Sequence, residues 1–200
     1  MKPPVFSQMD IEILDKKSLY QGFFALEQFT FKHKLFAGGW SQPVIREVFE
    51  RGHAVVVLPY DIQRDQVVLI EQVRFPALAT TKSPWLMELV AGMIAPTETA
   101  IDVAHRELLE ETGLVARSIH FVNSYLASPG GSTERFYFYW AEVDSTQACG
   151  LHGLAEEHED IRLHVVSREH AYHSVVAGEI DNASTVIGLQ WLQLNYQQLV

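Results

Sequence analysis

Residues 92–114 read GMIAPTETAIDVAHRELLEETGL, and this stretch predicts a helix that ends at Gly113. Glycine is favoured at such an end because it adopts left-handed backbone conformations without strain. Three glutamates, Glu107, Glu110 and Glu111, lie in the last turns, where the helix dipole disfavours negative charge. A helix that breaks local rules in this way indicates a functional site.

The positions of these glutamates on the helix indicate what they could do. The buried stripe is predicted to be Ile101, Ala104 and Leu108. Glu107 and Glu111 are four residues apart, so they share one face beside that stripe, at the rim of the core. Arg106 can pair with Glu110, which leaves two carboxylates unbalanced. A plain solvated acidic face is the alternative.

Composition limits the class of protein. The chain has 200 residues, 48% of them hydrophobic, which is enough for one sizeable core. A net charge of −10 without a Lys/Arg cluster argues against a nucleic-acid or anionic-membrane surface. Cys149 is the single cysteine, so no intrachain disulfide can form, and a reducing compartment is expected. The charged first twenty residues predict no apolar signal segment, and no stretch has the length of a membrane-spanning helix. We therefore expect a cytoplasmic protein.

The order of predicted elements is strands, helix, strands, helices. Strands are predicted at residues 29–36, 44–52, 53–61, 65–74, 84–92, 120–128 and 135–143, with a last strand after the acidic loop within 153–167. Helices are predicted at residues 99–112, from a Ser167 cap to near Gly178, and from about Asn182 to 194. This order predicts a mixed α/β layered domain over residues 51–200, preceded by an antiparallel β extension over residues 1–50.

The N-terminal extension needs a packing partner. A sheet of two or three strands is marginally stable by itself. The phenylalanines of this one include Phe23, Phe24, Phe29, Phe31 and Phe36. Either a partner subunit covers them, as in a symmetric dimer, or the extension folds back on its own domain.

The acidic helix matches a known pattern. Nine residues fit G-x5-E-x7-R-E-U-x-E-E-x-G-U, where U is a bulky aliphatic residue: Gly92, Glu98, Arg106, Glu107, Leu108, Glu110, Glu111, Gly113 and Leu114. In this the chain resembles the Nudix hydrolases. The resemblance implies an α/β/α sandwich with a mixed sheet, and metal-dependent hydrolysis of a nucleoside diphosphate linked to another group. Clustered glutamates suit such chemistry, because Mg²⁺ takes oxygen ligands and neutralises phosphate charge.

Most of the chain also resembles one branch of that family, the dimeric bacterial ADP-ribose pyrophosphatases. The resemblance rests on GFF at 22–24 and on residues 45–61, 70–76, 84–93, 127–135 and 153–172. Pro129, 15 residues beyond the box, is the proline typical of ADP-ribose hydrolases. The implied reaction is hydrolysis of ADP-ribose to AMP and ribose 5-phosphate by a homodimer.

The same resemblance implies a metal site. The expected ligands are the backbone carbonyl of Ala91 and the carboxylates of Glu107, Glu111 and Glu159. Mg²⁺ is the expected ion, with Mn²⁺ possible. Glu157 is the implied general base, although its loop also offers Glu156, Glu159 and Asp160, and physical reasoning alone does not choose among them.

Substrate contacts are implied in the same way. Phe23 and Phe24 match positions that stack on adenine, provided by the partner subunit, although both rings could instead be ordinary core aromatics. The remaining implied contacts are Arg46, Glu47 and Arg51 in the adenosine pocket, Arg74 at a phosphate, and Met93, Ser128, Pro129, Gly130 and Glu134 near the terminal ribose.

Other functions remain open at this point. A related Nudix hydrolase that acts on another sugar nucleotide, such as GDP-mannose, would have the same box and the same dimeric form. A non-catalytic ADP-ribose sensor is remoter, since such proteins lose box glutamates or gain a DNA-binding domain. A structural domain with an accidental acidic helix is remoter still. His170 and His173 are spaced for one helix face but lack a suitable third ligand, so no histidine metal site is expected.

Overall fold

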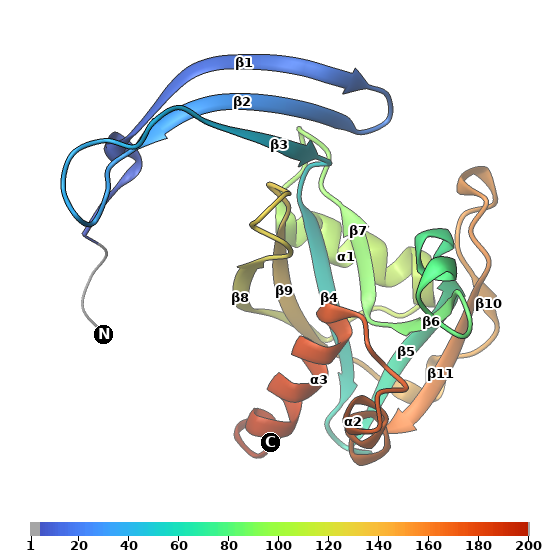
Figure 1. The fold of residues 1–200 in the computed structure, drawn as a ribbon. Coiled ribbons are helices and arrows are strands. Elements are labelled where there is room, and N and C mark those ends of the chain that lie inside the picture. The colour runs from blue at the N-terminus through green and yellow to red at the C-terminus, as the bar shows by residue number, and fades with distance from the viewer. Residues whose placement is uncertain (1–4, 200) are drawn as a thin grey trace. The chain divides into compact units, whose positions relative to one another are not determined.

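The computed structural model describes residues 5–199, apart from the side chain of Glu157. The chain forms two compact units (Figure 1). Unit 1 comprises Met1–Gly52 and Leu126–Glu134, and unit 2 comprises His53–Tyr125 and Arg135–Val200. No helix among the described residues is long and apolar enough to cross a membrane.

Unit 1 is built on an antiparallel three-stranded sheet. Its strands, in spatial order, are β1 (Ile11–Gln21), β2 (Ala25–His33) and β3 (Val44–Glu50). The sequence did not predict β1. Its pairing with β2 shifts register between Ile13 and Asp15 and again between Ser18 and Tyr20. Each shift displaces the alternation of side chains, so the period-two pattern that identifies a strand is lost.

Unit 1 has almost no interior. Among its described residues Glu134 alone is buried, and every residue of β1 is exposed. Several of the exposed side chains are large and apolar, including Ile11, Ile13 and Ile45.

Unit 2 is a mixed sheet covered by helices on both faces (Figure 1). The path of the sheet is β10-β11-β5-β4-β9-β8, with β6 beside β5 and β7 beside β4. Its strands are β4 (Ala54–Asp61), β5 (Gln66–Val73), β6 (Trp85–Glu88), β7 (Val90–Met93), β8 (Ser118–Leu126), β9 (Arg135–Glu142), β10 (Leu151–His152) and β11 (Ile161–Ser167). Its helices are α1 (Ala100–Thr112), α2 (Arg168–Val176) and α3 (Ala183–Asn195). The predicted fold class, a mixed α/β sheet with an N-terminal antiparallel sheet, is confirmed.

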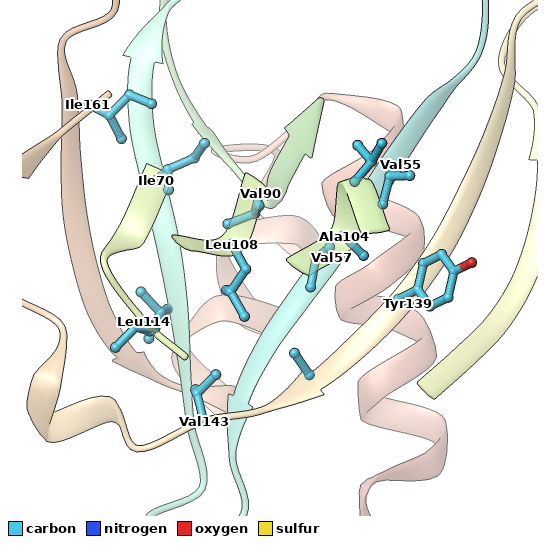
Figure 2. Close-up of a cluster of buried hydrophobic side chains, with 13 residues drawn as sticks. Val55, Val57, Ile70, Val90, Ala104, Leu108, Leu114, Tyr139, Val143 and Ile161 are labelled. Carbon is cyan, nitrogen blue, oxygen red and sulfur yellow. The ribbon is translucent and has the colours of Figure 1, made fainter. Parts of the chain in front are cut away.

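The core of unit 2 lies on both faces of its central strands. Val55 and Val57 of β4 join the cluster beneath α1, whereas Val56 and Leu58 join the cluster beneath α2 and α3. Figure 2 shows the first cluster, with side chains from β4, β5, β7 and α1 directed toward one another. Strands buried on both faces are continuous apolar runs, which is why HAVVVLPYD does not alternate.

Two details differ from the sequence-based expectation. The single strand predicted at 84–92 is two strands, because β4 and β5 pair only at their turn and each then takes a separate neighbour. Leu89 lies between them, and its N–H donates to the Thr185 hydroxyl at 3.0 Å. On α1, the buried stripe holds Val103 in place of Ile101, which is 38% exposed.

Candidate active site

The acidic helix α1 begins and ends at well-formed caps. The Thr99 hydroxyl accepts from the Asp102 N–H at 3.3 Å. Gly113 has φ +69°, and its N–H donates to the Leu109 carbonyl at 2.8 Å. Residues with a side chain are strained in this left-handed conformation, so the box glycine is needed there. These caps fix where the helix begins and ends.

Gly92 lies directly beneath Glu107. A Cβ built on Gly92 would overlap the carboxyl group of Glu107. The first glycine of the box therefore makes room for the first carboxylate predicted to bind metal. Glycine at such a position allows a close approach of backbone and side chain.

Glu111 is fixed against the same strand. Its side chain is buried, with 2% of the residue exposed, and its Oε2 accepts from the Ala91 N–H at 3.0 Å. The structure therefore brings together Ala91, Glu107 and Glu111, three of the four predicted metal ligands. A buried carboxylate is costly unless it is paired or coordinates a cation.

Arg106 pairs with more glutamates than the sequence indicated. Its guanidinium lies 3.0 Å from Glu98, 2.8 Å from Glu107 and 2.9 Å from Glu110. The arginine of the box therefore links the loop before α1 to the last turns of the helix. Glu98 also accepts from the Ala95 N–H at 3.0 Å, which holds that loop. Glu111 makes none of these contacts.

The acidic loop after β10 is attached to the end of α1. The Gly153 N–H donates to the Glu110 carbonyl at 3.4 Å. Glu159 accepts from the Leu154 N–H at 3.3 Å, which folds the loop on itself. The backbone of Glu157 ends the short 3-10 turn η4 (Ala155–Glu157), and its side chain lies outside the described part of the chain.

The carboxylates are close enough to alter one another's ionisation. Burial raises the pKa of Glu107 to about 7, and the charges of Glu110 and Glu159 add to this while Arg106 opposes it. Burial likewise raises the pKa of Glu111 well above its ordinary value, with Glu107 and Glu159 acting in the same direction. Glu159 thus comes near both helix carboxylates. Even so, no three His, Cys, Asp or Glu side chains of the described residues form a ready metal-binding group.

Arg74 lies beside these carboxylates. Glu88 of β6 holds it, with Nε at 2.9 Å and Nη2 at 2.8 Å from Oε2. The negative charges of Glu111 and Glu159 also act on it. The sequence predicted Arg74 but gave no sign of Glu88, because a glutamate within an apolar strand has no motif of its own.

Unit 1 gathers a second set of predicted residues. The ring of Phe24 meets Phe49 at 5.2 Å and Phe23 at 4.7 Å between centroids, and Arg51 lies 5.3 Å over its face. Arg51 pairs with Glu134 at 3.2 Å. Phe24 is thereby packed, whereas Phe23 touches only the edge or face of the Phe24 ring and remains 84% exposed.

The loop that carries Ser128, Pro129 and Gly130 is fastened to β3. The Phe49 N–H donates to the Gly131 carbonyl at 2.8 Å, and the Thr133 hydroxyl bonds to the Glu50 carboxylate. This attachment brings Glu134 to Arg51, although the two residues are far apart in sequence.

The other residues predicted to contact substrate are more exposed to solvent. Arg46 and Glu47 are exposed neighbours in β3, so their side chains leave opposite faces of the strand. Met93 ends β7 in unit 2 and is 38% exposed.

A family model decides the classification. Residues 50–185 match the NUDIX domain. The chain belongs to the Nudix family. Clustered glutamates on α1, the glycine beneath Glu107 and the capping glycine are therefore the Nudix box in its folded form.

Individual Nudix relatives cover nearly the whole chain. It is 55% identical over 197 residues to the ADP-ribose pyrophosphatase of Escherichia coli (strain K12), across 98% of this chain and 94% of that protein. It is 32% identical over 187 residues to the GDP-mannose pyrophosphatase of Yersinia pestis (strain Pestoides F), across 93% of each. A crystal structure of an ADP compounds hydrolase has the same fold, with a TM-score of 0.67 at 19% identity, across 94% of this chain and 97% of that one.

Proposed function

We propose that this protein is a Nudix hydrolase that cleaves the diphosphate of ADP-ribose, giving AMP and ribose 5-phosphate. The observation that carries the proposal is the intact set of box carboxylates, folded against β7, in a chain 55% identical to an ADP-ribose pyrophosphatase over nearly its full length. A protein that had lost catalysis would not need to retain these mutually repelling groups.

The residues present fit a divalent cation. Glu107 and Glu111 are buried carboxylates whose pKa values are raised, so a cation between them would relieve both burial and repulsion. We propose that Glu107, Glu111, Glu159 and the Ala91 carbonyl hold it, and that it is Mg²⁺ or Mn²⁺, since all the donors are oxygens. When bound, such an ion neutralises diphosphate charge and lowers the pKa of water.

The proton of the attacking water needs an acceptor. We propose Glu157, in the acidic loop attached to the end of α1, with attack at the adenosine-side phosphorus. Arg74 would bind a phosphate oxygen through its planar, permanently charged guanidinium. The ribose end would meet Met93, Ser128, Pro129, Gly130 and Glu134.

Unit 1 supplies the proposed adenosine end. Phe23 would stack on the base, and Arg51, Arg46 and Glu47 would line the pocket around it. Because none of the described apolar side chains of unit 1 is buried while Ile13 and other large ones are exposed, we propose that a second copy of the chain covers its sheet, giving a homodimer with shared active sites.

The dimer is tested by sedimentation of the wild type and Ile13→Lys. A buried charge without a partner disfavours an interface, so the variant should sediment as a monomer or dissociate at least about tenfold more readily. Val115→Lys, at an exposed site of unit 2, is the control. A wild-type chain that is monomeric at all concentrations would remove the proposal.

GDP-mannose is the alternative substrate, since a 32% identical relative carries that name. The test is hydrolysis in ¹⁸O-labelled water with Mg²⁺, using ADP-ribose and GDP-mannose in competition. We expect ADP-ribose to be preferred, with label in AMP and activity lost in Glu157→Gln. Preference for GDP-mannose would refute the substrate, and full activity in the variant would refute the base. No hydrolysis of any nucleotide sugar would instead indicate a sensor.

A further inference from the structure

Glu88 is a buried carboxylate that the Nudix box does not include. It is 7% exposed, at the end of β6, and it receives hydrogen bonds from Arg74 and from the Gln72 side chain at 3.3 Å. Gln72 is itself 6% exposed. Gln72 on β5 thus binds Glu88 on the adjacent strand β6, and Glu88 in turn binds Arg74.

The register places this group on the face of the sheet that carries the box. Glu88 is paired with Ile70, whose side chain belongs to the core cluster beneath α1. Gln72 is two residues further along β5 and therefore leaves the same face. Glu71 lies between Ile70 and Gln72 on β5, so its side chain leaves the opposite face, where it contacts His164 at 2.9 Å.

Arg74 has two possible sets of partners. It is bound to Glu88 through Nε and Nη2, and it also lies within the electrostatic influence of Glu111 and Glu159. Those two carboxylates would be left without a cation if no metal were bound. An arginine free to move would pair with them, because opposite charges attract strongly in a partly buried site. Such a pair would compete directly with a divalent ion.

We propose that Glu88 is a positioning residue that holds the Arg74 guanidinium at the phosphate position and keeps it from occupying the carboxylates of Glu111 and Glu159. The part played by phosphate rests on the proposed function. The competition for carboxylates does not, since it requires only the charges of the protein and a cation.

The decisive test measures the affinity of the full chain for Mn²⁺ in the absence of substrate. Electron paramagnetic resonance detects the free and bound ion during the titration. Residues that orient a metal site commonly change metal affinity roughly 10- to 100-fold when replaced. Glu88→Gln should therefore weaken Mn²⁺ binding by about tenfold or more. Glu88→Gln combined with Arg74→Gln should bind Mn²⁺ at least as tightly as the wild type, because the competing charge is gone. Glu71→Gln, which removes the same charge from the other face, should leave the affinity unchanged.

Unchanged Mn²⁺ affinity in Glu88→Gln would overturn the proposal. So would a double variant as weak as the single one, because the effect would then not pass through Arg74. Thermal unfolding of each variant identifies any that does not fold.

If Glu88→Gln does not fold, Arg74→Gln alone still tests the idea. It should raise the KM for ADP-ribose while Mn²⁺ binds no more weakly than in the wild type, and weaker Mn²⁺ binding would contradict the competition. If the protein fails to hydrolyse ADP-ribose at all, the proposed function falls, and the Mn²⁺ titrations continue to decide the role of Glu88.

Discussion

Strands β1 and β4 show how differently the two units are stabilised. All eight residues of β4 are buried, whereas all eleven residues of β1 are exposed. Burial of an apolar side chain stabilises a fold by roughly 1.5–3 kcal/mol, so β4 contributes to a self-sufficient core and β1 does not. Unit 2 is therefore expected to be stable through its own interior, whereas the proposed second copy of the chain would cover the exposed side chains of unit 1.

This difference also separates the proposed roles. Unit 2 holds carboxylates rigidly against β7, where chemistry demands fixed geometry. Unit 1 presents an exposed ring, Phe23, next to the packed pair Phe24 and Arg51. We therefore expect substitutions in unit 2 to change stability, metal binding or kcat, and those in unit 1 to change KM or association.

The largest expected effect is on the core of unit 2. Leu108→Ala should lower the free energy of unfolding by about 2–5 kcal/mol, because Leu108 is 1% exposed and the cavity would not collapse fully. The adjacent Leu109→Ala, at a 52% exposed position, should stay within about 0.5 kcal/mol. Urea unfolding at several protein concentrations measures both. An equal decrease in the free energy of unfolding in the two variants would contradict the inference that unit 2 is stabilised by its own core.

Removing a helix carboxylate should abolish most of the activity. Glu111→Gln keeps an acceptor for the Ala91 N–H but loses the charge, so kcat should fall roughly 10²- to 10³-fold, the equivalent of about 3–4 kcal/mol. Steady-state kinetics with ADP-ribose and Mg²⁺ give the value. Glu110→Gln, whose carboxylate is paired with Arg106, is the matched variant and should lose much less. The reverse ranking would show that Glu110 is the more important group.

Without metal, the stability of unit 2 should fall as pH rises. The pKa of Glu107 is raised by burial from its ordinary value of 4.5 to about 7 in the folded protein. A carboxyl group raised in this way stabilises the fold fully below its unfolded pKa, and this contribution is lost as pH rises through the folded pKa. Urea unfolding in EDTA between pH 4.5 and 8 should therefore show a loss of up to about 3 kcal/mol.

Two changes should make that pH profile less steep. Glu107→Gln removes one of the two buried carboxyl groups with a raised pKa and leaves Glu111, and excess Mg²⁺ would compensate the charge of both. A metal-free wild type whose stability stays constant over this range would contradict the account of a repelling, buried carboxylate.

The smallest expected effect concerns unit 1. Phe23→Ala should raise the KM for ADP-ribose roughly 5- to 100-fold, since stacking of a base on an aromatic ring contributes about 1–3 kcal/mol. Its kcat should change little, because the ring is proposed to hold the base and not the diphosphate. Phe23→Tyr, which keeps a ring, is the control. A variant that loses kcat with an unchanged KM would remove the proposed division of roles.

The sequence by itself determined the family and the box helix. Most of the nine box residues lie on or just after one helix, where a periodic stripe, a capping glycine and glutamates four apart follow from helix geometry. The central apolar strands were equally readable, because burial on both faces leaves a continuous apolar run.

Only the tertiary structure decided the rest. The bulged strand β1 carries no clear period, and the division of 84–92 into β6 and β7 depends on which neighbours β4 and β5 take. The Arg74–Glu88 pair and the Arg51–Glu134 pair join residues on different segments. Such contacts depend on how strands and loops are brought together, and no spacing along the chain records that.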